Sequence, residues 1–225
     1  MPAISRGQLL EPCWQGMRFH LRPALVLQAC ALAIVCGYFW SPQVHDALDV
    51  VGALKVRYGY LYSAIATCIF GGLIPYLVLT LAGRIPRERR WSELAFYLLL
   101  WFWKGIEVDT LYRAQAAWFG ESPSFGTIAI KTAVDQFGYV PLWAAASQVL
   151  LFTWKDADFS VSATRAAFER QPFAQRVLVV TCSTWVVWIP AVAIIYSLPS
   201  ALQVPLFNLV LCFWCLLMSF ISRES

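Results

Sequence analysis

Charged side chains interrupt two strongly apolar stretches of the chain between Phe102 and Pro141. If these stretches lie in a bilayer, each ionisable side chain costs about 2.5–3.5 kcal/mol on insertion scales, so it usually faces a partner or a water-filled space. The chemistry open to such side chains is ion pairing and the binding of small charged solutes. The candidate site residues are Lys104, Glu107, Asp109, Arg113, Lys131, Asp135 and Gln136.

Each charge in this set has an opposite charge three or four residues away, the spacing that puts two side chains on one face of a helix. The expected ion pairs are Lys104 with Glu107, Asp109 with Arg113, and Lys131 with Asp135. At about 100° per residue, the first two pairs point to nearly opposite sides of one helix. They therefore require two different neighbours, such as a second helix, the membrane boundary or water.

Two interpretations of these charges remain open. Intramembrane charge tends to mark a solute pathway, which favours a cavity lined by the pairs and by Gln136. The same side chains could instead hold helices together as polar contacts, measured at about 0.6 kcal/mol on average between membrane helices.

The residues that could support metal or redox chemistry form no complete set. Cys212 and Cys215 have a CxxC spacing, but no second pair or histidine accompanies them, and zinc needs four ligands. His20 and His45 lie outside the expected spans, and His45 with the two acids that follow it is more typical of a solvated loop. Neither Gly-x-Ser-x-Gly nor His-Glu-x-x-His occurs. We therefore expect no metal, no cofactor and no enzymatic activity.

The composition indicates which elements must position the charges. The 225 residues are 60% hydrophobic and 13% charged, and spans of about 20 residues would consume most of this length. We expect an all-α integral membrane bundle of about six transmembrane helices, with a polar segment at 1–22, one membrane domain at 23–222 and a tail at 223–225. The spans are expected at 23–40, 61–81, 91–118, 127–152, 177–196 and 202–222.

The connections between these spans are expected to be short and polar. Residues 41–60 should form a polar connection, and 120–126 and 197–202 tight turns with proline. Residues 154–176 alternate Phe with Arg, a pattern typical of an amphipathic helix lying in the membrane interface. Gly71 and Gly72 inside the second span allow close helix contact.

Aromatic and basic residues predict how the chain sits in the bilayer. Aromatic side chains fall near the proposed span ends, as interfacial belts do: Trp91, Trp118, Trp154 and Tyr196. Most Lys and Arg residues fall in the amino terminus and in the connections after the second and fourth spans. By the positive-inside rule, both termini face the cytoplasm-equivalent side.

The basic cluster after the second span is interpreted as a topology signal, with contact to anionic lipid as a secondary role. It consists of Arg84, Arg87, Arg89 and Arg90. The expected partner is the lipid bilayer. Nucleic acid is not expected, and whether copies of the chain associate is left open.

A further motif lies in the fourth to sixth spans. It consists of Lys131, Asp135, Gln136, Gly138 and Pro141, then Trp188-Ile189-Pro190-Ala191, and then Phe213-Trp214 through Ser219-Phe220. Over about residues 55–222, this combination resembles the family of the twenty-two-kilodalton peroxisomal membrane protein and its mitochondrial inner-membrane relatives. The family residues that carry over are Lys131, Asp135, Gln136, Pro141, Trp188 and Pro190, and the resemblance gives them no catalytic role.

The resemblance implies a compact helical bundle for which pore-like behaviour toward small solutes has been proposed. It also implies an organelle membrane, mitochondrial inner or peroxisomal, or a related bacterial cytoplasmic membrane. Together with the intramembrane charges, it favours a pore or transporter for small charged solutes. The alternative is a structural or partner-binding membrane protein with paired charges and no transport.

Overall fold

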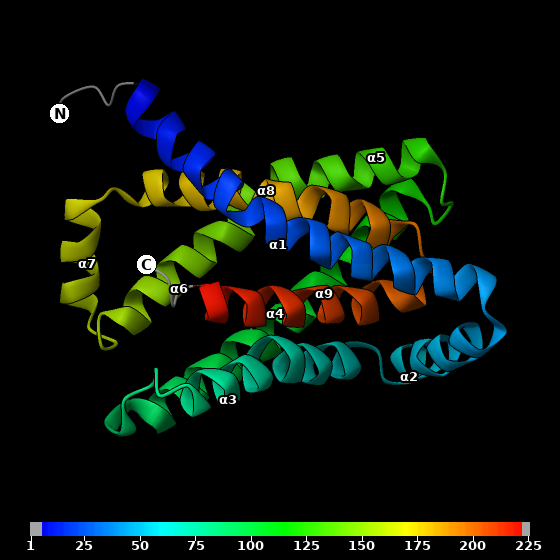
Figure 1. The fold of residues 1–225 in the computed structure, drawn as a ribbon, viewed down its shortest axis with the longest axis horizontal. Helices are drawn as coiled ribbons and strands as arrows, with labels where there is room; N and C mark the ends of the chain where they lie inside the picture. The colour runs from blue at the N-terminus through cyan, green and yellow to red at the C-terminus, as the bar shows by residue number, and fades with distance from the viewer. Residues whose placement is uncertain (1–5, 222–225) are drawn as a thin grey trace. The chain divides into compact units, whose positions relative to one another are not determined.

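The computed structural model describes the backbone of residues 6–221 and the side chains of 11–22 and 24–216. Within these residues the chain is helical and contains no strand (Figure 1). In chain order the elements are α1 (Arg6–Trp40), α2 (Pro42–Thr67), the π-helical η1 (Cys68–Leu73), α3 (Ile74–Leu81), the 3₁₀ turn η2 (Arg87–Arg89), α4 (Arg90–Phe119), α5 (Phe125–Ala133), the π-helical η3 (Val134–Ala144), α6 (Ala145–Asp156), α7 (Val161–Arg170), α8 (Phe173–Tyr196) and α9 (Ser200–Ile221).

The described chain divides into two compact units. Unit 1 contains residues up to 26 and 132–190, and unit 2 contains 27–131 and 191 onward. In unit 1, Ala145, Val149 and Val177 form a small apolar core between α6 and α8. Arg176 borders this core, and its guanidinium donates to the Thr153 hydroxyl and to a backbone carbonyl of α7.

Unit 2 is built around α2 and η1, which pack against α4 and α9. Glycines permit the closest contacts. A Cβ at Gly71 would lie 2.7–2.8 Å from side-chain atoms of Leu211 and Trp101. A Cβ at Gly105 of α4 would overlap the Ser63 carbonyl oxygen of α2. These positions therefore bring the helix backbones together, as expected for Gly71.

Proline accounts for the two π-helical segments. Pro75 follows η1, and Pro141 lies inside η3. A proline has no N–H and its ring clashes with the carbonyl four residues earlier. Widening the turn by one residue relieves that clash, which is how such segments arise inside α-helices.

Residues 41–60 do not form the polar connection that the sequence analysis expects. α2 begins at Pro42, directly after Ser41, because proline is pre-organised for the first helical position and helix formers follow it. The helix is interrupted at Gly59, where φ is 54° and ψ is −125°. A positive φ favours glycine, so the break occurs at this residue.

Two other expected segments also differ. Residues 6–22, expected as a polar segment, belong to α1. The stretch 154–176 contains a ten-residue helix, α7, between the end of α6 and the start of α8. The amphipathic helix is therefore shorter than the stretch that predicted it.

Two helical stretches are long and apolar enough to cross a membrane. They are Pro42–Leu81, with 40 residues, and Phe173–Tyr196, with 24. The pair Glu11–Arg22 and Ala24–Trp40, bent by 49°, is a third candidate if it crosses as one span. The described residues thus contain two or three such stretches rather than six. α4 carries buried charges, and the described apolar part of α9, Ser200–Leu216, is shorter than a span.

The close contact at Gly105 predicts that one added methyl group at this position destabilises the protein. Gly105→Ala should lower the free energy of unfolding by about 1–3 kcal/mol, because the new Cβ forces α2 and α4 apart. Thermal unfolding in detergent micelles, followed by tryptophan fluorescence, measures the effect. Gly126→Ala is the control, since no atom lies within 4 Å of its Cβ position. Equal melting of the two variants would contradict the close packing.

Candidate functional site

The best-defined polar cluster is the Asp109 network of unit 2, which consists of Lys55, Ser63, Asp109 and Arg113. Lys55 Nζ donates to both carboxylate oxygens of Asp109, at 3.0 and 2.9 Å. Ser63 Oγ donates to Oδ2 at 2.8 Å, and Arg113 Nε donates to Oδ1 at 2.9 Å. A carboxylate offers about four lone-pair sites, so these donors satisfy Asp109, which is only 2% exposed.

The Gly59 break helps to assemble this network. Lys55 and Ser63 are eight residues apart, and a regular helix would separate them by about 12 Å along its axis. Gly59 lies midway between them and redirects the chain, and both side chains reach Oδ2 of Asp109. The guanidinium of Arg113 also lies at the break, since a Cβ at Gly59 would be 3.6 Å from its Nη2.

Arg113 forms the exposed edge of the Asp109 network. Its side chain is half exposed, whereas those of Lys55 and Asp109 are almost fully buried. The guanidinium lies 4.6 Å from the ring centroid of Tyr60, close enough for a cation–π contact. The network thus joins the buried α2–α4 contact to the surface of unit 2.

Both ion pairs that spacing predicts within α4 are present. Asp109 bonds Arg113, and Lys104 Nζ donates to both carboxylate oxygens of Glu107 at 2.8 and 3.0 Å. Both side chains of the second pair are largely buried. Because Lys131 belongs to unit 2 and Asp135 to unit 1, the third pair remains a prediction.

Lys131 differs from the other buried cations of unit 2. Within unit 2 it makes no hydrogen bond and no ion pair, although it is only 3% exposed. Its ammonium lies 5.7 Å from the ring centroid of Tyr196. Glu121 attracts it from beyond ion-pair distance, and the Glu121 carboxylate already accepts from Ser200 Oγ at 2.7 Å. Lys131 is therefore a buried positive charge without a direct counter-ion within unit 2.

Tyr196 also joins a polar contact that the sequence analysis missed. Gln115 Nε2 donates to the Tyr196 hydroxyl at 2.8 Å, and Gln115 is fully buried. Its Oε1 is buried without a hydrogen-bond partner among the described residues. Tyr112 packs edge-on against the Tyr196 ring. Tyr196 is the last residue of α8, at the end of a candidate span as expected, and its side chain is buried in the interior of unit 2.

Two other buried polar side chains connect α2 to α9 in unit 2. Thr67 Oγ1 of α2 donates to Asn208 Oδ1 of α9 at 2.7 Å. Asn208 Nδ2 has no hydrogen-bond partner within the described chain. A single asparagine in an apolar helix was the available signal, since burying its amide is costly without a partner.

The Asp135-Gln136 part of the motif lies in η3 of unit 1, where both residues are buried. Gln136 Nε2 donates to Asp135 Oδ1 at 3.0 Å. In a π-helix the Gln136 carbonyl would accept from residue 141, but Pro141 has no N–H. Trp185 Nε1 of α8 donates to this carbonyl instead, at 3.0 Å. The other motif residues, Trp188 and Pro190, lie on α8, five residues or fewer from Trp185.

The metal and redox candidates do not assemble into a site. No group of three or more His, Cys, Asp or Glu side chains within the described residues is arranged to hold a metal ion. His45 lies on α2 rather than in a loop, with Nε2 3.4 Å from an Asp49 oxygen in an exposed pair. Cys212 and Cys215 lie on α9, and neither forms a disulfide within the described residues.

The fold and these contacts define a helical protein, with two or three helices able to cross a membrane and with charges buried between helices. Comparison of the chain with protein-family models, with curated proteins and with solved structures gives no match.

The Asp109 network predicts that removing one of its charges lowers the free energy of unfolding more than removing two opposite charges together. Asp109→Leu should destabilise the protein by roughly 3–5 kcal/mol, because it leaves Lys55 buried without a counter-charge. Asp109→Leu combined with Lys55→Met should recover most of this loss, since Arg113 can reach water. Chemical denaturation in micelles measures the free energies of unfolding.

Glu169→Leu is the control for this prediction. It breaks an ion pair with Arg165 at the same four-residue spacing, but both side chains are mostly exposed. Its effect should stay within about 0.5 kcal/mol. A double variant no more stable than Asp109→Leu would show that the network is not held together by charge compensation.

Proposed function

We propose that this protein is a multi-pass membrane protein that moves small anionic solutes across the bilayer, with unit 2 providing the solute-binding position. Lys131 is the observation that carries the proposal. A buried ammonium without a counter-ion costs several kcal/mol. Intramembrane charges that are kept at such a cost usually mark a solute pathway, and the ligand that suits a lone buried cation is an anion.

The surroundings of Lys131 suit a small anion with polar oxygens. The Tyr196 ring lies beside the Lys131 ammonium, and its hydroxyl belongs to a hydrogen-bonded contact with Gln115. An ammonium and a phenol hydroxyl can together bind a carboxylate or a halide. Glu121, which acts on Lys131 from a distance, would compete with the anion and allow its release.

The interrupted helix in unit 2 also supports transport. Spans broken at glycine or proline, with backbone groups freed near buried charges, are a recurring feature of transporters. The break at Gly59 lies beside the Asp109 network, whose Arg113 edge is half exposed. A rearrangement of this network would expose charge without unfolding the helices.

The proposal includes the arrangement of the chain in its membrane. Six helical stretches would cross the bilayer, with both termini on the cytoplasm-equivalent side, as the distribution of Lys and Arg indicates. The membrane would be that of an organelle, mitochondrial inner or peroxisomal, or a bacterial cytoplasmic membrane. The cluster from Arg84 to Arg90 would then face anionic lipid.

A structural or partner-binding role is the second candidate, favoured by the saturation of Asp109. A carboxylate that accepts four hydrogen bonds is typical of a rigid contact between helices. This role predicts that each buried charge stabilises the fold. The two candidates therefore differ most sharply at Lys131.

Lys131→Met tests the transport proposal, because it removes the charge and keeps most of the volume. We expect a higher thermal midpoint, since an unpaired buried charge is lost, together with at least a tenfold lower flux of chloride or acetate. Flux is measured in liposomes that contain the purified protein. Lys131→Arg should retain part of the flux, because the positive charge is kept.

Arg165→Gln is the control, since it removes an exposed cation of unit 1. It should leave both flux and stability unchanged. Sealed liposomes with folded wild-type protein, or equal flux for wild type and Lys131→Met, would contradict transport. A Lys131→Met variant that melts at a lower temperature would favour the structural role.

A further inference from the structure

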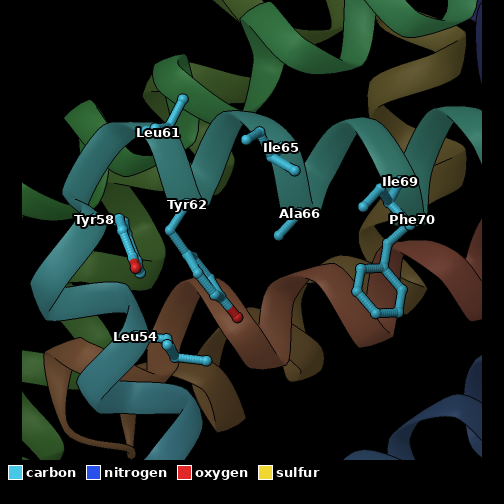
Figure 2. Close-up of a pocket in the computed structure, with 8 residues that line it drawn as sticks. All are labelled: Leu54, Tyr58, Leu61, Tyr62, Ile65, Ala66, Ile69 and Phe70. Carbon is cyan, nitrogen blue, oxygen red and sulfur yellow. The ribbon is translucent and has the colours of Figure 1, made fainter.

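A long apolar groove runs along α2 and η1 in unit 2 (Figure 2). Its volume is about 440 Å³, and its wall is almost entirely apolar. Leu54 and Tyr58 lie at one end, and Ile69 and Phe70 at the other, with Ile65 in the middle. The Gly59 break lies between two of these lining segments, so the groove follows the bend of the helix.

The dimensions of the groove fit one extended hydrocarbon chain. After the break at Gly59, the lining from Leu61 to Phe70 follows one helical stretch that rises about 14 Å at 1.5 Å per residue, the length of several methylene groups of an extended chain. The groove lies on the stretch Pro42–Leu81, which is apolar enough to cross a membrane. The molecules that surround such a span are lipids.

A basic side chain marks one end of the groove. Arg57 is exposed, and its guanidinium lies 5.4 Å from the ring centroid of Tyr58, a lining residue. Leu54, three residues before Arg57, is at the same end (Figure 2). A cation near the membrane surface attracts an anionic headgroup by about 1 kcal/mol. The opposite end, at Phe70, is apolar.

We propose that this groove binds one acyl chain of an anionic membrane lipid, whose phosphate faces Arg57. The apolar wall takes up the chain, and the guanidinium selects the charge of the headgroup through N–H donors that suit phosphate oxygens. Tyr58, under the guanidinium, holds Arg57 at the groove end. This lipid site is separate from the basic cluster between α3 and α4, and it does not depend on whether the protein transports a solute.

Native mass spectrometry of the detergent-purified protein tests the site. The probes are phosphatidylglycerol and phosphatidylcholine with the same two acyl chains. Wild type should bind phosphatidylglycerol about fivefold more tightly, which corresponds to roughly 1 kcal/mol. Arg57→Gln should remove this preference and leave phosphatidylcholine binding unchanged. Arg165→Gln, which removes an exposed cation of unit 1, should keep the preference.

Filling the groove separates chain binding from charge attraction. Ile65→Trp should weaken the binding of both lipids, because the indole occupies the middle of the groove, and Leu61→Trp is the second such variant if Ile65→Trp does not fold. Both native side chains are about half exposed, so the larger ring has room. Thermal unfolding confirms that each variant is folded.

Three results would overturn the proposal. Equal affinity of wild type for the two lipids would show that Arg57 does not select charge. Unchanged lipid binding in a folded tryptophan variant would place the lipid elsewhere. Displacement of phosphatidylglycerol by an equal concentration of glycerol phosphate would show that the headgroup alone binds, without the groove.

Discussion

A charge buried between helices must be compensated, and unit 2 depends on this constraint. The carboxylate of Asp109 is satisfied only because α2 and α4 approach closely enough for Lys55 and Ser63 to reach it. Gly105 permits that approach, since its missing Cβ leaves room for the Ser63 carbonyl. Gly59 permits the bend that brings both donors to one oxygen. The two glycines and the ion pair therefore form one arrangement, in which a change at any member disturbs the others.

In both units, side chains lie beside the irregular segments of the backbone. Proline widens η1 and η3 into π-helical turns, and every freed carbonyl in an apolar interior needs a donor. In unit 1 the indole of Trp185 supplies that donor to Gln136, next to the buried carboxylate of Asp135. In unit 2 the irregular backbone at Gly59 lies beside the guanidinium of Arg113. Broken helices are tolerated here because side chains from elsewhere in the same unit lie beside the irregular backbone, and in unit 1 one of them donates a hydrogen bond to a freed carbonyl group.

Lys131 stands apart because its surroundings within unit 2 offer an aromatic ring and a distant carboxylate but no direct counter-charge. A paired charge can be explained by stability alone, whereas an unpaired buried charge reduces stability and so points to a ligand. The groove along α2 has the opposite character, with an apolar wall and one cation at its end. Under the two proposals, unit 2 would bind a small anion in its polar interior and a lipid chain on its outer surface.

Local spacing in the sequence determined that Lys104 meets Glu107 and that Asp109 meets Arg113, since side chains three or four residues apart share a helix face whatever surrounds them. It also determined the apolar, helical character of the chain. Only the tertiary structure decided that Lys55 and Ser63 donate hydrogen bonds to the Asp109 carboxylate. It also decided that residues 42–58 are helical and that Tyr196 is buried. The helix period specifies which side chains share a face. Which distant helix covers that face depends on packing between residues far apart in the chain, and no local pattern records it.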